Sequence, residues 1–258
     1  MHAIVPGPLS NKLLAALPHK DFQLLIPHLI SVQLAQGTAL HEPGVDVDQV
    51  YFPLSGMISM VVVMRDGKAI ETATVGREGV VGAMSGLGLP VSQVRAIAQL
   101  PMFASRIAST EMRKAVAASK PIADLCLLYN EVLLAQARIT AACNALHQVE
   151  ARFCRWLLQT RDRAESDTIM LTQEFLSEML GVRRTSVTEV ASKIQANGAI
   201  SYSRGLIKIV DLDALKAMSC ECYDTLREQA SGEMLAPFAG QCGGQRAPGA
   251  RAITERSR

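Results

Sequence analysis

The apolar and polar positions follow two different periods along the chain, and the period changes near residues 31, 109 and 199. Between residues 31 and 106, short β-branched runs alternate with turn residues, which is typical of strands. Candidate strands cover residues 50–52, 57–64, 69–75 and 91–100. Asp66-Gly67 lies between two of them and is a strong hairpin signal. This segment therefore predicts a small closed β structure, a barrel or a roll.

Helical spacing dominates before and after the β segment. Residues 9–30 carry apolar side chains at helical spacing that Pro18 and Pro27 interrupt, so we expect several short helices there. Residues 109–161 are helical, and a further helix over residues 149–163 has Phe153, Trp156, Leu157 and Leu158 as its core. Residues 162–168 form a polar connection, and residues 199–210 are β-prone. Residues 212–226 then predict one more helix.

One long helix carries an apolar seam in which the spacing alternates between three and four residues. A seam of more than three heptads is the pattern of a coiled coil, so residues 119–147 predict a dimerisation helix. A long helix packed only on its own domain is the alternative. The seam consists of Ile122, Leu125, Tyr129, Val132, Gln136, Ile139, Cys143 and Leu146. A second apolar face, which we assign to packing on the β segment, consists of Leu127, Leu128, Leu133 and Leu134.

Residues 173–190 predict two short helices joined by a tight turn. Thr172 is a good N-cap for the first helix, and Leu176 and Leu180 lie one turn apart on its apolar face. Gly181 supplies the left-handed conformation that a sharp turn needs. The apolar face of the second helix consists of Val187, Val190 and Ile194. Its opposite face carries Arg183, Arg184, Thr185, Ser186, Thr188 and Glu189.

Two β-prone runs then flank Arg204-Gly205, which predicts a hairpin. Helix, turn, helix and hairpin in this order define a winged helix-turn-helix. Guanidinium and hydroxyl groups exposed at the N-terminal end of a helix suit the major groove of DNA, so this segment indicates DNA binding. An ordinary helical hairpin in a soluble core is the alternative. That alternative is disfavoured because the cap, the turn glycine and the apolar residues all stand at the spacing of a helix-turn-helix, and a hairpin follows them.

Composition changes this picture little. Residues 152–210 hold nine basic and six acidic side chains in a chain of net charge +2. This modest excess is compatible with a sequence-specific regulator, because hydroxyls and backbone amides also bind phosphates. The sequence has no glycine-rich phosphate loop, metal-ligand cluster or nucleophile motif, which argues against an enzyme and against a cofactor. No apolar run approaches the length of a membrane span, and the N-terminal residues lack the pattern of a signal peptide.

The six cysteines favour a reducing cytoplasm, because three of them occupy helical positions as small apolar side chains. Cys220 and Cys222 are too closely spaced for the usual zinc knuckle, and no second pair accompanies them in the sequence. We therefore expect no metal site. Residues 231–258 are rich in Gly, Ala, Pro and Arg without periodicity, which predicts a disordered tail.

A β-roll, a long helix and a C-terminal winged helix-turn-helix in this order resemble the Crp/Fnr family of bacterial transcription regulators. The resemblance is most specific over residues 171–187. It implies an α+β fold with a cyclic-nucleotide-binding-like β-roll sensor domain at residues 1–118, a dimerisation helix at residues 119–147 and a winged helix-turn-helix domain at residues 148–218. It further implies a homodimer that binds double-stranded, pseudo-palindromic DNA, with RNA polymerase and an unidentified small-molecule effector as additional partners.

By position, the resemblance implies that Arg184 reads guanine, since an arginine fork can bond O6 and N7 together. Thr185 stands where many members have a glutamate that reads cytosine, and Glu189 where the type member has a second base-reading arginine. The bound DNA sequence therefore does not follow from the family. Further candidates for base or phosphate contacts are Arg183, Ser186 and Thr188. Backbone contacts are expected from Thr172, Gln173, Lys193, Ser203, Arg204 and Lys208, with a merely solvated position as the alternative for the two lysines.

The predicted effector pocket departs from the cyclic-nucleotide binders of the family, in which a Gly-Glu pair caps the ribose and a later arginine holds the cyclic phosphate. Here Ala83 follows Gly82 and cannot accept a ribose hydroxyl, and Ser92 aligns with the arginine. Strand alternation places Ser92 inside and Arg95 outside. Because a buried phosphate without a cation is poorly compensated, we expect cyclic AMP not to be the effector. The degenerate pocket consists of Gly82, Ala83, Ser85 and Ser92.

Two hypotheses about function remain open on the sequence. The first is a homodimeric DNA-binding regulator, and the second is a small-molecule or cyclic-nucleotide sensor that acts through protein contacts. Arg183 and Arg184 beside two hydroxyl residues favour the first. The N-terminal four-cysteine pattern of the oxygen-sensing branch is absent, since the first cysteine is Cys126. Haem ligation is an alternative for three histidines, each of which is more simply a surface or core residue: His19, His28 and His41.

Overall fold

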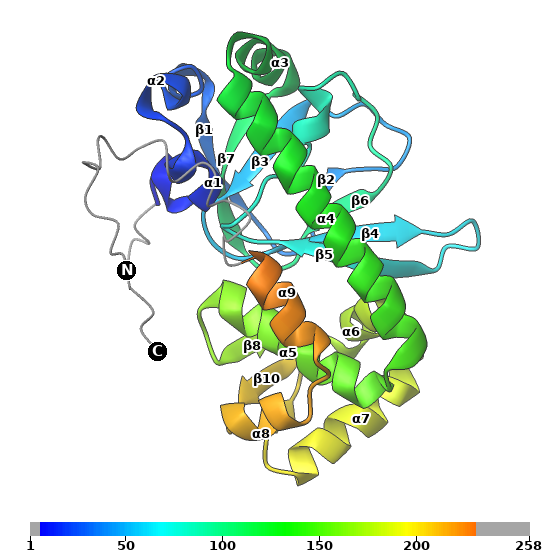
Figure 1. Cartoon of the computed structure of the whole chain (residues 1–258). Coiled ribbons are helices and arrows are strands. Elements are labelled where there is room, and N and C mark those ends of the chain that lie inside the picture. The colour runs from blue at the N-terminus through cyan, green and yellow to red at the C-terminus, as the bar shows by residue number, and fades with distance from the viewer. Residues whose placement is uncertain (1–5, 231–258) are drawn as a thin grey trace, which may run out of the picture.

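The computed structural model describes residues 6–230, so the predicted tail at residues 231–258 lies outside the described residues. Figure 1 shows two unequal parts joined by one long helix. The chain enters through short helices, as the prolines at residues 18 and 27 predicted. These helices are η1 (Pro8–Ser10), α1 (Lys12–Ala16), α2 (His19–Phe22) and η2 (Ile26–His28).

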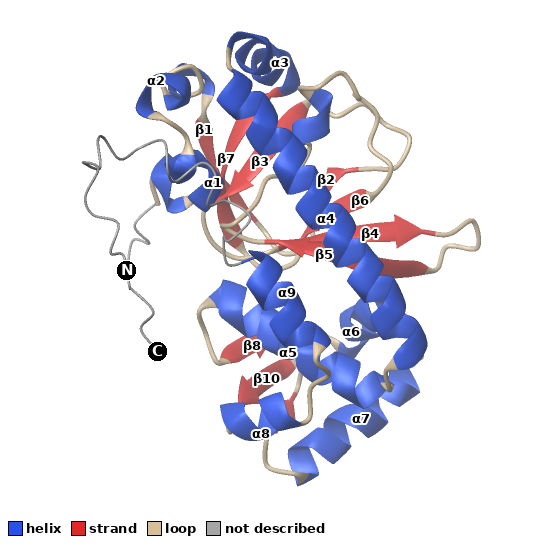
Figure 2. Ribbon diagram, in the orientation of Figure 1, coloured by secondary structure: helices blue, strands red, loops and turns tan. Residues whose placement is uncertain are grey.

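The larger part is a β-roll built from two antiparallel sheets, coloured red in Figure 2. One sheet has the order β1-β7-β3 and the other the order β2-β6-β4-β5. The roll also contains one turn of 3-10 helix, η3 (Ala83–Ser85). The strands are β1 (Ile30–Leu34), β2 (Ala39–His41), β3 (Gln49–Pro53), β4 (Ile58–Val63), β5 (Ala69–Val75), β6 (Arg95–Ala98) and β7 (Met102–Ala108).

The predicted hairpin and most predicted strands are confirmed. Met64 N–H donates to the Lys68 carbonyl at 2.7 Å, which closes the turn at Asp66-Gly67. Strand β6 is shorter than the predicted strand over residues 91–100, because Ser92 pairs its backbone with Gly44 and Val45 instead of with the sheet. Strands β1, β2 and β7 were not predicted.

Helix α3 (Ser109–Ala118) leads into the long helix α4 (Lys120–Leu146). The Ser119 hydroxyl caps α4 by accepting from Ile122 N–H at 3.2 Å. Figure 1 shows α4 running from the roll to the smaller part of the molecule. It packs on strand β5 and on helix α3, which explains why one of its faces is continuously apolar.

The assignment of the α4 seam to a dimer interface is wrong. Ile122, Leu125, Tyr129 and Val132 are at most 4% exposed and belong to the core of the roll. Gln136 and Cys143 are buried as well, and Ile139 is partly buried, whereas Leu146 is 78% exposed. The alternative, a long helix packed on its own domain, describes the seam from Ile122 to Cys143.

The face that was assigned to the roll is divided: Leu133 packs against the core of the roll as predicted, whereas Leu127 and Leu134 are turned outward. Leu127 is 52% exposed and Leu134 is 41% exposed, while Leu128 and Leu133 are half-buried. Ala141 is exposed one heptad beyond Leu134. Helix α4 therefore buries its predicted seam in its own chain and leaves Leu127, Leu134 and Ala141 exposed.

Helix α5 (Val149–Ala164) begins the smaller part and buries Phe153, Trp156, Leu157 and Leu158 as predicted. The predicted single helix over residues 212–226 is wrong: α8 ends at Ala217, where Ser219 N–H bonds to the Lys216 carbonyl, and α9 begins at Cys222. The remaining elements are β8 (Thr168–Met170), α6 (Gln173–Leu180), α7 (Arg184–Ala196), β9 (Ile200–Ser203), β10 (Leu206–Ile209), α8 (Leu212–Ala217) and α9 (Cys222–Ala230).

The two parts share a continuous core and a buried ion pair. Met57, Val61 and Leu100 of the roll pack in the same apolar cluster as Trp156. Arg163 on α5 pairs with Glu78 of the roll at 2.8 Å, and both side chains are almost fully buried. Burial of such a pair requires a defined arrangement of the two parts, because either charge left alone would be costly. No helix of the described residues is long and apolar enough to cross a membrane.

Candidate functional site

Helices α6 and α7 form the predicted helix-turn-helix. The Thr172 hydroxyl accepts from Phe175 N–H at 3.2 Å and caps α6, and Gly181 adopts φ +64° at its C-terminal end. Leu176, Leu180 and Val187 are buried between the helices. The turn also touches the roll, since a Cβ atom on Gly181 would lie 2.7 Å from Ile70 Cδ1.

Helix α7 presents a polar face to solvent. Arg183 precedes its first turn as the N-cap residue, and Arg184, Thr185, Thr188 and Glu189 are exposed. Ser186 is half-buried, and the Thr188 hydroxyl donates to the Arg184 carbonyl at 3.1 Å. The apolar face is buried by Val187, Ala191 and Ile194, with Val190 half-buried.

The wing is a two-residue hairpin between β9 and β10. Arg204 has φ +50° and Gly205 has φ +78°. Positive φ at both central residues is the geometry of a type I′ turn, whose twist matches that of the flanking strands. Strand β8, which was not predicted, completes a three-stranded sheet in the order β8-β10-β9.

A groove of about 440 Å³ lies between the start of α6, the start of α7 and the wing. Six predicted DNA-contacting residues line it: Thr172, Gln173, Arg184, Thr188, Ser203 and Arg204. Sequence reasoning missed three further lining residues: Ser192, Tyr202 and Gly205. The fold thus gathers donors from three separate segments along one concave surface.

The other predicted DNA-contacting residues lie outside this groove. Lys193 pairs with Glu150 at 2.5 Å, while Lys208 is exposed on β10. Among the described residues, Arg183, Arg184, Arg204 and Lys208 form no ion pair within the chain, so their charges are available to a ligand. The ion pair with Glu150 supports the alternative that Lys193 is a solvated surface residue without a DNA contact.

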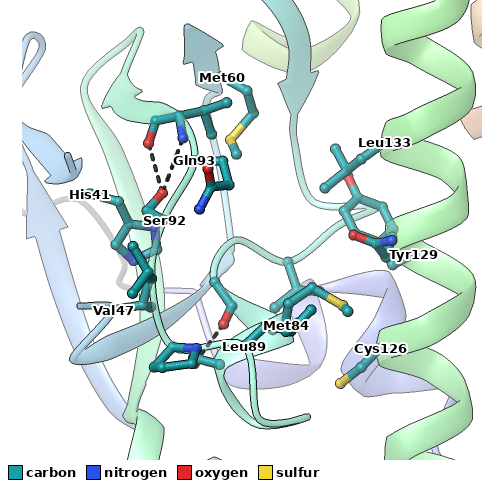
Figure 3. Close-up of a pocket in the computed structure, with 18 residues that line it drawn as sticks. His41, Val47, Met60, Met84, Leu89, Ser92, Gln93, Cys126, Tyr129 and Leu133 are labelled. Atoms are coloured by element: carbon teal, nitrogen blue, oxygen red, sulfur yellow. Dashed lines mark hydrogen bonds between the residues drawn. The ribbon is translucent and has the colours of Figure 1, made fainter. Parts of the chain in front are cut away.

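A second concave site lies in the roll, with a volume of about 590 Å³. All four residues predicted for the effector pocket line it: Gly82, Ala83, Ser85 and Ser92. Figure 3 shows Tyr129 and Leu133 of α4 facing His41 and Ser92 across the cavity. Helix α4 therefore contributes one wall of the pocket, which the sequence analysis did not predict.

The pocket carries no fixed charge. Among its described lining residues there is no Lys, Arg, Asp or Glu. Burial lowers the pKa of His41, whose Nε2 lies 2.8 Å from the Gln49 carbonyl oxygen. The Ser92 hydroxyl donates to the Val94 carbonyl at 2.7 Å, and Arg95 pairs with Glu42 at 2.8 Å outside the pocket. Figure 3 shows the mainly apolar lining that results.

A group of four side chains escaped the sequence analysis. Cys143 and His147 at the end of α4 lie beside Cys220 and Cys222, and their donor atoms are all within 4.8 Å of one another. In the folded chain, Cys143 and His147 therefore supply the second pair that is not apparent from the spacing of Cys220 and Cys222. The signal in the sequence was Cys143 and His147 four residues apart on one helix face, more than seventy residues before the other pair.

A helix-turn-helix with a wing, placed behind a β-roll and a long helix, defines a transcription regulator with separate sensing and DNA-binding domains. Residues 31–119 match the family model of the cyclic nucleotide-binding domain, and residues 151–218 match that of the Crp-like helix-turn-helix domain. The chain belongs to the Crp/Fnr family of DNA-binding transcription regulators, and the prediction that it is not an enzyme is confirmed by this assignment.

Solved structures share the fold at low identity. A Crp/Fnr-family transcriptional regulator from Eubacterium rectale is 18% identical with a TM-score of 0.65, and the match covers 82% of this chain and 97% of that one. The c-di-GMP responsive global regulator CLP of Xanthomonas campestris is 16% identical with a TM-score of 0.62, covering 74% and 99%. A CRP/FNR-family regulator from Thermus thermophilus is 21% identical with a TM-score of 0.58, covering 74% and 98%. A search of curated proteins found no match.

Proposed function

We propose that the chain acts as a homodimer that binds a pseudo-palindromic DNA site through α7 and its wing, without a cyclic nucleotide as effector. The groove between α6, α7 and the wing carries this proposal, since it unites Arg184 with hydroxyl and amide donors. A twofold dimer would present two such grooves about one duplex turn apart.

Within the groove, Arg184 is assigned to base reading. Its side chain is exposed at the first turn of α7, where a helix in the major groove meets base edges. Thr172 and Gln173 at the start of α6, together with Ser203 and Arg204 of the wing, are assigned to phosphates, which fix the register without reading sequence.

The outward face of α4 is the surface that a second copy would cover. Leu127, Leu134 and Ala141 repeat at heptad spacing along it and are all exposed. Glu131 and Arg138 flank this row and pair with each other at 3.0 Å. In two-stranded coiled coils, one of the two contact positions repeats at this spacing, with charges beside the contact line.

The pocket of the roll is assigned to a ligand other than a cyclic nucleotide. A cyclic phosphate placed there would face no cationic lining residue, and a charge buried without a partner is strongly penalised. Arg95 would have to leave Glu42 to reach it. Calorimetry with cyclic AMP and cyclic GMP should detect no binding at micromolar concentrations, and micromolar binding of either nucleotide would contradict this part of the proposal.

Fluorescence anisotropy with fragments of the chain's own upstream region tests DNA binding. We expect Arg184→Ala to weaken specific binding by about 5- to 150-fold, the equivalent of about 1–3 kcal/mol for a bidentate guanine contact. Arg113→Ala is the matched control, because it removes an exposed arginine from α3 at the opposite end of the molecule (Figure 1). Wild-type protein that binds no fragment at low salt would favour the alternative, a sensor acting through protein contacts.

A further inference from the structure

The cluster at the end of α4 contains four metal-ligating side chains from two distant segments. Cys143 lies in the last turn of α4, and His147 is its C-cap residue. Cys220 and Cys222 follow the wing, in the loop between α8 and α9 and at the first residue of α9. The three cysteines are buried, and the imidazole is about three-quarters covered.

Two separations between donor atoms match the edges of a tetrahedron around one ion, and all four donor atoms lie within 4.8 Å of one another. Cys143 Sγ lies 3.6 Å from Cys220 Sγ, and Cys222 Sγ lies 3.6 Å from His147 Nδ1. With Zn–S bonds of about 2.3 Å and a Zn–N bond of about 2.0 Å, a tetrahedron has edges of about 3.5–3.8 Å. The four protein ligands of an iron–sulfur cluster are distributed over two or four iron atoms, so they do not all converge on one point.

The groups around the cluster suit a metal–thiolate centre. Glu221 Oε1 lies 3.1 Å from His147 Nε2, which leaves Nδ1 directed at Cys222. In zinc sites, the imidazole nitrogen that does not bind the metal usually donates a hydrogen bond to a group such as a carboxylate.

Two buried cations beside the cluster supply an independent observation. Arg152 and Arg155 on α5 are at most 7% exposed, and within the described residues neither forms an ion pair. A thiolate at Cys143 would lie within electrostatic reach of both, and the Nε atom of each has no hydrogen-bond partner among the described residues. Three thiolates around a dication carry a net charge of −1, which would offset part of this buried positive charge.

We propose that Cys143, His147, Cys220 and Cys222 bind a single Zn²⁺ ion with tetrahedral geometry. Four protein ligands leave no open position, so the ion is structural and not catalytic. It ties the start of α9 to the junction of α4 and α5, where the DNA-binding part leaves the long helix; Figure 1 shows α9 lying along these helices.

Metal analysis of the full chain, purified under reducing conditions, tests the site. We expect one zinc ion per chain in the wild type and in Cys154→Ser, which removes a buried thiol of α5 outside the cluster. Cys222→Ser should lose the zinc. Glu221→Gln should keep all four ligands but bind zinc about 10- to 100-fold more weakly in competition with a chromophoric chelator.

Cobalt substitution of the wild type keeps the test independent of how the variants fold. Co²⁺ should produce the intense d–d bands of a tetrahedral ion together with thiolate charge-transfer absorption. Three results would overturn the proposal: no metal and no cobalt–thiolate spectrum in reduced wild-type protein, iron with acid-labile sulfide in place of zinc, or a Cys143–Cys220 disulfide in protein kept under reductant.

Discussion

Replacing Glu71 with glutamine should remove a loss of stability that the wild type suffers as the pH rises. Glu71 on β5 is buried where the roll meets α5, and its Oε1 accepts from Trp156 Nε1–H at 2.9 Å. Its Oε2 lies 2.5 Å from Ser59 Oγ, which also lies 2.7 Å from Gln99 Oε1. One hydroxyl proton cannot serve both oxygens, whereas a protonated Glu71 can donate to Ser59 while Ser59 donates to Gln99.

The magnitude follows from the proton affinity of this carboxyl group. Burial raises the pKa of Glu71 from its ordinary value of 4.5 to about 7, against the opposing effects of its hydrogen bonds and of nearby arginines. The folded state therefore binds the proton more tightly than the unfolded state. The resulting stabilisation is complete below pH 4.5 and is lost as the pH rises through about 7. The difference corresponds to about 3 kcal/mol of unfolding free energy.

Urea unfolding of wild type and Glu71→Gln between pH 4.5 and pH 8 measures this effect. The glutamine keeps an acceptor for Trp156 and a donor for Ser59, so it imitates the protonated acid. We expect the wild type to lose about 3 kcal/mol relative to the variant across this range. Parallel pH profiles for the two proteins would refute the assignment of a raised pKa to this buried carboxyl group.

Two further predictions concern the dimer face and the turn of the helix-turn-helix. Leu134→Lys should convert a dimer into a monomer in sedimentation equilibrium, whereas Leu24→Lys, at an equally exposed leucine between α2 and η2, should leave the dimer intact. If both variants remain dimers, the α4 interface is contradicted. Gly181→Ala should destabilise the chain in urea by more than the roughly 1–2 kcal/mol of a left-handed alanine, because its Cβ would also crowd Ile70. Gly198→Ala is the control, because Gly198 also has positive φ but no neighbouring atom near the added Cβ. Equal losses of stability in the two variants would show that the Ile70 side chain moves aside without cost.

The helix-turn-helix and its wing could be predicted because their signals are local. Thr172, Gly181 and Arg204-Gly205 each determine the backbone geometry of a few neighbouring residues, and the structure confirms all three. The groove follows from these elements, although Tyr202 also lines it, which the sequence pattern did not indicate.

The partners of α4 could not be predicted, because periodicity identifies which residues share a face but not what covers that face. The spacing of the apolar residues from Ile122 to Val132 is equally compatible with a coiled coil and with a core inside one chain, and the structure has the second. The cysteine cluster could not be predicted for a related reason. Cys143 and Cys220 are 77 positions apart, and only the packing of α9 on α4 brings them together.

Selection of bound sequences from random DNA by the purified wild type tests most directly whether a dimer reads DNA through α7. We expect enrichment of a sequence with twofold symmetry, whose half-site centres lie about 10 base pairs or a multiple of that apart, and loss of the enrichment in Arg184→Ala. No enriched sequence, or an enriched sequence without twofold symmetry, would contradict a dimer that reads DNA through paired copies of α7.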